Sequence, residues 1–380
     1  MQPLSGVKVV ELTNNIAGPY TGYILAMLGA DVLKIERPEG GDDARGWGPP
    51  FWHGTSATFH AVNVNKRGIT LNLKDPADIA WLEAYVDDCD VLVHNLRPGV
   101  MDDLGLGAEA LRARNPRLVY CSISAFGREG PMQRHPGYEP MVQAFSGLFS
   151  INGYPDRPGV RIGTSVLDLG SAVWAALGCV AGLLQRAQTG RGCVVDASLY
   201  ETALGLLTVH LARYQASGRL PERHPSGSQA VVIFEALDTA DGQVIVAAAN
   251  DRLFARFSGA LGHPEWAQDQ RFKTNKDRVA HKGALMAMVR EIMLQRSTAE
   301  WVERLDAVAV PSAAINDIAH MKAHPQTAAL GIVQPVPEVE LDLMSLPLSL
   351  DGSRPAIRTR APRLGEHNEE VRGSPGAAKT

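Results

Sequence analysis

The chain has 380 residues, of which 45% are hydrophobic and 21% charged, and its formal net charge at pH 7 is −4. This balance gives no electrostatic reason to expect binding to nucleic acid or to an anionic membrane. The length exceeds that at which a single hydrophobic core usually stops growing, so we expect two domains.

Apolar strands and helices alternate along the first third of the chain. The pattern predicts strands at residues 7–12, 30–35, 69–73, 91–94 and 118–123, and helices at 19–28, from 75 onward and at 106–114. Pro19 suits a first helical position, and Gly29 suits the residue after the last turn. A strand, a helix and a second strand in this order form a βαβ unit, which implies a parallel sheet. We therefore predict a doubly wound α/β domain for the first half.

The second half is richer in helices. Helices are predicted at 138–149, from Asp168 onward and at 198–217, the last with a capping box formed by Ser198 and Glu201. A polar segment rich in glycine and proline, 221–229, is typical of a linker. Two apolar runs joined by D-T-A-D-G then predict a hairpin at 231–236 and 244–249, followed by helices at 251–261, 276–294 and 298–305. These elements predict a smaller α+β domain over residues 225–320.

Asp168 stands at the start of an apolar, glycine-rich run that continues to Leu184 and predicts a buried helix. Asp is favoured at such a place because its oxygens accept free backbone N–H groups and meet the positive end of the helix dipole. A lone carboxylate in close-packed surroundings can also serve as a nucleophile or a base. The local sequence leaves both roles open.

Several function classes lack their sequence signature. The loop after the first strand, N-N-I-A-G-P-Y-T-G, does not have the glycine spacing of a dinucleotide-binding G-x-G-x-x-G. H-E-x-x-H and G-x-S-x-G motifs are also missing, so neither a zinc site nor a serine hydrolase is expected. Basic residues cluster early in the chain, and an anionic ligand could use such a cluster. They are Lys34, Arg37, Lys66, Arg67, Lys74 and Arg97.

The four cysteines are scattered and form no C-x-x-C pair, which favours a reducing compartment and no structural metal. The first residues contain no apolar core of a signal peptide. The longest uninterrupted apolar run, residues 172–184, is shorter than the roughly 20 residues that span a bilayer. We therefore expect a cytoplasmic protein.

A series of segments in this order resembles the class III CoA-transferase family, whose members act on carnitine, bile acids and oxalate or formyl thioesters. The segments are V-V-E-L-T-N-N-I-A-G-P, L-G-A-D-V-L-K-I-E-R-P, G-D, N-K-R-G-I-T-L-N-L-K, H-N-L-R-P-G-V, S-I-S-A-F-G-R-E-G-P, P-G-Y-E-P-M-V-Q-A-F-S-G-L, S-V-L-D-L-G-S-A and T-G-R-G-C-V-V-D-A-S-L-Y-E-T-A. The resemblance covers about the first 215 residues, and P-R-L-G-E-H-N near the end also fits.

The resemblance implies a Rossmann-like large domain made from residues 1–215 and 325–380, a small α+β domain and an intertwined, ring-like homodimer. It also implies that coenzyme A lies along the loops after the strands, as a substrate, with no metal and no permanently bound cofactor. Asp168 would be the nucleophile. The residues carried over to CoA binding are Ile16, Ala17, Arg37, Leu71, Lys74, Asn95, Leu96, Arg97, Tyr138 and Glu139. Relatives often carry a basic residue where this chain has Asp103, which puts one contact to a CoA phosphate in doubt.

The implied activity is CoA transfer from an acyl-CoA to a carboxylic acid, through an anhydride and an aspartyl-CoA thioester on Asp168. Two alternatives remain. One is an α-methylacyl-CoA racemase, although racemase relatives have G-H-D where this chain has Gly137-Tyr138-Glu139. The other is a CoA-binding module without catalysis. Arg161 and the segment 224–229 could meet a distal carboxylate, which suggests a small dicarboxylic acid such as succinate as donor.

Overall fold

The computed structural model describes residues 2–228 and 230–373. Contacts within the chain divide it into two compact units, which are described separately. Unit 1 comprises Met1–Leu148, Arg161–Arg213 and Pro325–Thr380, and unit 2 comprises Phe149–Val160 and Tyr214–His324. Unit 1 therefore contains segments from both ends of the sequence.

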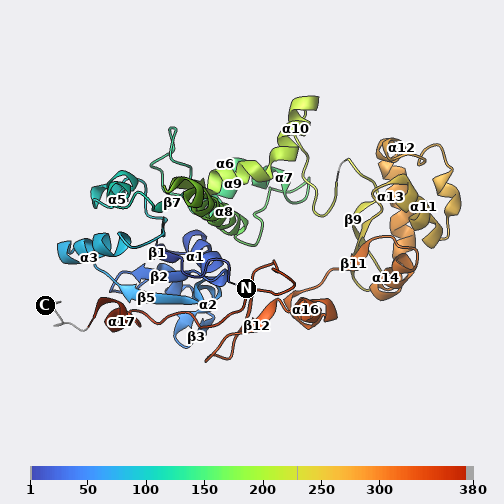
Figure 1. The fold of residues 1–380 in the computed structure, drawn as a ribbon. Helices are drawn as coiled ribbons and strands as arrows, with labels where there is room; N and C mark the ends of the chain where they lie inside the picture. Colours follow the sequence, from blue (N-terminus) through green and yellow to red (C-terminus); the bar gives the residue numbers. More distant parts are fainter. Residues whose placement is uncertain (1, 229, 374–380) are drawn as a thin grey trace. The chain divides into compact units, whose positions relative to one another are not determined.

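A six-stranded parallel sheet forms the centre of unit 1, in the order β5-β2-β1-β6-β7-β8 (Figure 1). Its strands are β1 (Lys8–Leu12), β2 (Asp31–Glu36), β5 (Lys66–Thr70), β6 (Val91–His94), β7 (Val119–Ser124) and β8 (Val194–Ser198). Every neighbouring pair is parallel. The parallel α/β arrangement predicted from the alternating pattern is thus confirmed.

Two strands differ from the sequence prediction. Strand β5 begins at Lys66, three residues before the predicted start, because the Lys66 side chain is buried beside a carboxylate of the core instead of being solvated. Strand β8 was not predicted. It lies at the edge of the sheet beside β7, and its first three residues are only partly buried or exposed, so it lacks a continuous apolar run.

Helices and short strands complete unit 1. The helices are α1 (Ala17–Met27), η1 (Asp43–Gly46), α2 (Ala57–Asn63), α3 (Pro76–Val86), α4 (Val100–Asp103), α5 (Ala108–Arg114), α6 (Glu139–Ser146), α8 (Val166–Thr189), α9 (Leu199–Leu206), α16 (Pro325–Leu330) and α17 (Asn368–Arg372). The short strands are β3 (Phe51–Trp52), β4 (Thr55–Ser56), β12 (Val333–Pro335) and β13 (Asp342–Met344). Helices α7 (Leu148–Ile151) and α10 (Thr208–Ser217) carry the chain from unit 1 into unit 2.

Helix α8 packs against α1 and against strands β7 and β8 (Figure 1). Its glycines permit this close approach: a Cβ atom on Gly178 would lie 2.4 Å from Val195, and one on Gly182 would lie 2.7 Å from Cys193. With 24 residues, α8 is longer than the apolar run noted in the sequence, and by length and composition it could cross a membrane. Core helices of soluble proteins can have the same length and apolar composition. The cytoplasmic location stays a prediction.

The C-terminal segment lies along the β5 edge of the sheet. The backbone N–H of His367 donates to the Gly68 carbonyl (2.9 Å), and the Gly68 N–H donates to Nδ1 of His367 (3.1 Å). Asn368 accepts a hydrogen bond from the Thr70 N–H (2.9 Å). These contacts show why P-R-L-G-E-H-N belongs with the N-terminal motifs: its last residues occupy an edge that would otherwise expose unpaired backbone groups.

Unit 2 is an α+β assembly around a three-stranded antiparallel sheet, β11-β10-β9. The predicted hairpin is confirmed by the pairing of β9 with β10. The predicted helix over 276–294 is interrupted at His281, whose backbone (φ −113°, ψ 23°) leaves the helical conformation. The elements are β9 (Phe234–Asp238), β10 (Gln243–Ala247), β11 (Ser312–Ala314), α11 (Asp251–Ala260), η2 (Pro264–Ala267), α12 (Asn275–Ala280), α13 (Lys282–Met293), α14 (Thr298–Ala307) and α15 (Ile318–Ala323).

Candidate active site

A cavity of about 440 Å³ lies at the carboxyl ends of the unit 1 strands, between the loops that follow β1, β6 and β7. Parallel α/β sheets usually bind ligands at this edge, where the loops diverge. The first residues of α6, α8 and α9 complete the wall. All lining residues belong to unit 1.

Most of the residues predicted for the site lie in this cavity. The resemblance drew the predicted residues from six separate stretches of sequence, and the fold brings eight residues from four of these stretches to the same wall. These are Ile16, Ala17, Asn95, Leu96, Arg97, Tyr138, Glu139 and Asp168. Their predicted roles in binding and catalysis stay predictions.

Three predicted CoA-binding residues do not line the cavity. Leu71 is buried in the hydrophobic core of the sheet, and Lys74 is exposed on the loop after β5. Arg37 forms an ion pair with Asp43, which does line the cavity. Arg37 therefore contacts a residue of the cavity wall without lining the cavity itself. Leu71 and Lys74 lie outside the wall.

Asp168 occupies the first turn of α8, as the third residue of the helix. The helix-capping position belongs to Ser165, and the Asp168 carboxyl makes no hydrogen bond or ion pair with any described residue. Burial and the negative charge of Glu139 raise the pKa of Asp168 to about 7, and Arg161 opposes them. Desolvation and a like charge both disfavour the ionised form of a carboxyl, so the direction of the shift follows from the surroundings of Asp168.

Glu139 is a second, buried carboxylate in the cavity wall. It forms an ion pair with Arg161 (Nη2 to Oε2, 3.0 Å), and it accepts a hydrogen bond from Gln143 one turn along α6. Gln143 in turn accepts the backbone N–H of Ile162 (2.9 Å), which fixes the segment that carries Arg161. The Arg161 side chain remains 39% exposed and lines the cavity, so it is accessible to a ligand there.

The family model described as CoA-transferase family III matches residues 4–368. The chain belongs to this family. It is 36% identical to a succinate–glutarate CoA-transferase of Agrobacterium fabrum, over 97% of this chain and 94% of that protein. It is 33% identical to the succinyl-CoA:glutarate CoA-transferase of Homo sapiens, over 98% of this chain and 85% of the relative.

Solved structures agree with the sequence comparison. The crystal structure of a CAIB/BAIF family protein from Brucella suis superposes with a TM-score of 0.87 at 36% identity, covering 98% of both chains. The fold and the family membership together identify an enzyme of the CoA-transferase class, whose substrates are CoA thioesters.

The early basic cluster of this family III chain does not act as one surface. Lys34 and Lys66 are wholly buried and ion-paired with Glu11, so the expectation that an anionic ligand could use them is wrong. Arg67 is held by Asp31 and Glu370. Among the six basic residues, Arg97 alone lines the cavity, and its guanidinium has no acidic partner in residues 2–228 and 230–373.

Sequence reasoning missed several residues of the wall. Asn14, Asp43, Trp47, His135 and Ser165 all line the cavity. The doubled asparagine after β1 was the available signal for Asn14, whose backbone N–H and carbonyl are both bonded by Asn95. The two distances are 2.9 and 2.7 Å.

Proposed function

We propose that this family III enzyme transfers CoA from a short dicarboxylyl-CoA, such as succinyl-CoA, to a carboxylic acid acceptor, with Asp168 as the nucleophile. The observation that carries the proposal is the Asp168 carboxyl itself. It is unpaired within the described structure, faces a cavity built from the CoA-binding motifs, and lies on a fold shared with CoA-transferases. Two relatives, each 34% identical to this chain, are named as a succinyl-CoA–D-citramalate CoA-transferase and a succinyl-CoA–L-malate CoA-transferase beta subunit.

The first half-reaction loads CoA onto the enzyme. A carboxylate oxygen of Asp168 attacks the thioester carbonyl of the donor, the C–S bond breaks, and CoA leaves as a thiolate. The thiolate then attacks the Asp168 carbonyl of the resulting anhydride, which releases the donor acid and leaves an aspartyl-CoA thioester. The acceptor carboxylate reverses these steps. Water must stay out of the cavity, because hydrolysis of either intermediate would waste the thioester.

Arg161 is proposed to bind the distal carboxylate of a dicarboxylic substrate. Its guanidinium is already aligned by Glu139 and is partly open to the cavity. Arginine can hold two carboxylates at once, since its five N–H donors form a planar fork. The second predicted element, the segment 224–229, belongs to unit 2, and Gln229 lies outside the described residues.

A homodimer is proposed as the working form. Helices α8 and α10 leave large apolar side chains exposed, including Trp174, Leu177, Val209 and Leu211. Apolar patches of this kind mark protein interfaces. The L-malate relative is named as a beta subunit, and another relative is named as the alpha subunit of a succinyl-CoA–L-malate CoA-transferase. A solution mass equal to one chain would contradict this part of the proposal.

The activity is tested by exchange of labelled acids. Purified enzyme is incubated with succinyl-CoA and a panel of ¹⁴C-labelled carboxylic acids, and labelled acyl-CoA is separated by chromatography. We expect label in the CoA ester of at least one acid. A CoA-binding module would transfer none. A racemase would instead exchange the α-proton of a 2-methylacyl-CoA in ²H₂O without transferring CoA, and either result would refute the proposal.

The substitution Arg161→Met tests the substrate class. We expect KM for a dicarboxylic acceptor to rise about a hundredfold, because one charge-assisted pair is lost, while KM for a monocarboxylic acceptor changes little. Arg128→Met serves as the control, since Arg128 is a largely exposed arginine paired with Asp196 and does not line the cavity. Equal losses for both acceptor types would contradict a role for Arg161 in binding the distal carboxylate.

A further inference from the structure

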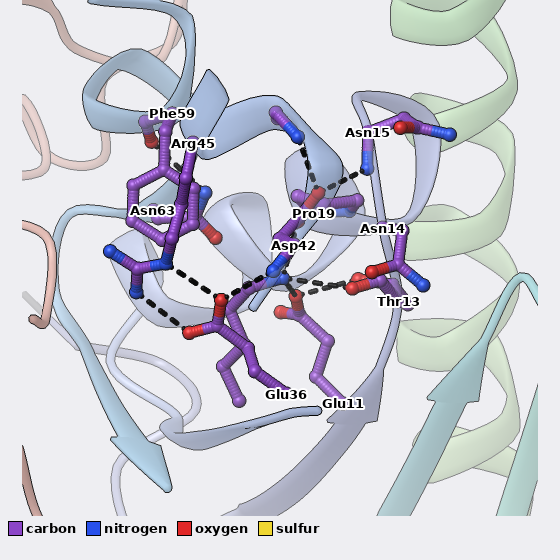
Figure 2. Close-up of polar contacts among 12 residues, drawn as sticks. Glu11, Thr13, Asn14, Asn15, Pro19, Glu36, Asp42, Arg45, Phe59 and Asn63 are labelled. Carbon is purple, nitrogen blue, oxygen red and sulfur yellow. Dashed lines mark hydrogen bonds and ion pairs between the residues drawn. The ribbon is translucent and has the colours of Figure 1, made fainter. Parts of the chain in front are cut away.

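A buried ionic cluster joins side chains of β1, β2 and β5 to Asp42, the residue before η1 (Figure 2). Its members are Glu11, Lys34, Asp42 and Lys66, and each side chain is buried. Lys34 Nζ lies 2.9 Å from Asp42 and 3.3 Å from Glu11, and Lys66 Nζ lies 2.8 Å from Glu11. None of the four lines the cavity.

Stability alone does not explain this cluster. Removing four charged groups from water has a large desolvation cost, and well-packed apolar residues of similar volume often give equal or greater stability. The fold also makes room for it: a Cβ atom on Gly22 of α1 would lie 1.8 Å from a carboxylate oxygen of Glu11. Buried polar networks that are fully hydrogen-bonded rigidify their surroundings. The hydrogen bonds between the cluster and the neighbouring residues therefore indicate which segments of the chain it fixes in place.

Lys66 donates to the Pro19 carbonyl and to the Asn63 side chain, away from the cavity. The bonds of Asp42 and Lys34 go to the backbone of two segments that line it. One oxygen of Asp42 accepts the N–H of Asn15 and the N–H of Ala44, both at 2.9 Å, so it joins the loop after β1 to the start of η1. Asn15 and Asp43 both line the cavity. Lys34 donates to the Thr13 carbonyl at 2.9 Å, which fixes the same loop from its other side.

Asn15 has a left-handed backbone conformation, with φ of 70°. That conformation is uncommon in residues other than glycine, and asparagine adopts it more readily than most. Figure 2 shows the Asn15 backbone nitrogen directed at Asp42 and its side-chain amide pointing away from the cluster. The ion pair with Lys34 and the two amides lower the pKa of Asp42 although its burial opposes them. Asp42 therefore remains an ionised acceptor.

We propose that Asp42 is a positioning residue for CoA binding, which sets the spacing of the cavity walls formed by Asn14–Ala17 and Asp43–Trp47 through its bonds to Asn15 and Ala44. The assignment rests on the proposed function only in taking CoA as the ligand of this cavity. Asp42 does not touch the ligand in this proposal.

The test is the substitution Asp42→Asn, read by calorimetric titration with CoA and by kcat and KM for acyl-CoA. An asparagine cannot present oxygens both to Lys34 and to the two amides. At least one of these bonds is therefore lost, and one wall of the cavity is no longer held in place. We expect the Kd for CoA to rise about tenfold or more, because displacements of about 1 Å weaken binding and catalysis strongly. We expect kcat at saturating acyl-CoA to change less than about threefold, since Asp168 lies on a different element.

Asp90→Asn is the matched control. Asp90 precedes β6 at the amino ends of the strands of the same sheet, where it accepts the Lys8 N–H (2.7 Å) and pairs with Arg186 (2.8 Å). The Asp90→Asn variant loses the same charge and the same kind of bonds, but Asp90 does not line the cavity. An unchanged Kd in Asp42→Asn, or an equal loss in both variants, would overturn the assignment. A wild-type enzyme that binds CoA without transferring it would refute the proposed function and leave this assignment standing.

Hydrogen exchange in the wild-type enzyme provides a measurement that does not depend on the variant folding. The assignment requires slow exchange of the Asn15 and Ala44 amides before any ligand is added. Exchange at the rate of an unprotected loop would overturn it.

Discussion

Replacing Asp168 with alanine is expected to abolish CoA transfer while leaving CoA binding intact. The alanine variant cannot form the anhydride or the aspartyl-CoA thioester, so the rate should fall by about four orders of magnitude or more, as for the loss of other covalent nucleophiles. The side chain makes no bond that holds the cavity together within the described residues. The Kd for CoA should therefore stay within about twofold of the wild-type value in a calorimetric titration.

Glu109→Ala is the matched control for this experiment. Glu109 is also an acidic residue in the first turn of a helix, α5, but it is exposed and lies outside the cavity. Transfer by this variant should equal that of the wild type. Near-normal turnover by Asp168→Ala would remove Asp168 from the mechanism, and a loss of CoA binding would show that its role is structural.

The fold could be predicted well from the sequence because its signals are local. The alternation of apolar strands and helices predicted the parallel sheet, and the D-T-A-D-G turn predicted the β9–β10 hairpin. Strand β8 escaped prediction because it is a half-exposed edge strand without a continuous apolar run. The break at His281 also left no clear mark in a sequence with helical periodicity on both sides.

The site was predicted less completely, because its properties depend on partners distant in the sequence. Lys34 and Lys66 are basic residues in a basic stretch, and nothing nearby indicates that Glu11 and Asp42 neutralise them inside the core. The pKa of Asp168 depends on Glu139, which comes from another helix. Motif order could place residues in one cavity, but burial and charge pairing required the folded chain.

The proposed nucleophile has a pKa near neutrality, so the rate of the reaction should depend on pH. With a pKa of about 7 for Asp168, kcat/KM for acyl-CoA should rise about tenfold per pH unit below pH 7 and level off above it. Glu139→Gln removes the like charge that helps to raise this pKa, so the inflection should move to lower pH. If the pH profiles of kcat/KM for the wild type and for Glu139→Gln coincide, the inflection cannot be assigned to Asp168 beside Glu139.

The same ionisation should appear in stability, with a sign that is set by proton binding. An Asp in the unfolded chain titrates near pH 3.9, whereas Asp168 in the folded enzyme titrates near 7. Between these values the folded state binds more protons, so the contribution of Asp168 to the free energy of unfolding is lost as pH rises from about 4 to about 7. Asp168→Asn keeps the shape and cannot ionise. Its Tm should therefore exceed the wild-type Tm by more at pH 8 than at pH 5, and a constant difference would show that Asp168 is ionised throughout this range.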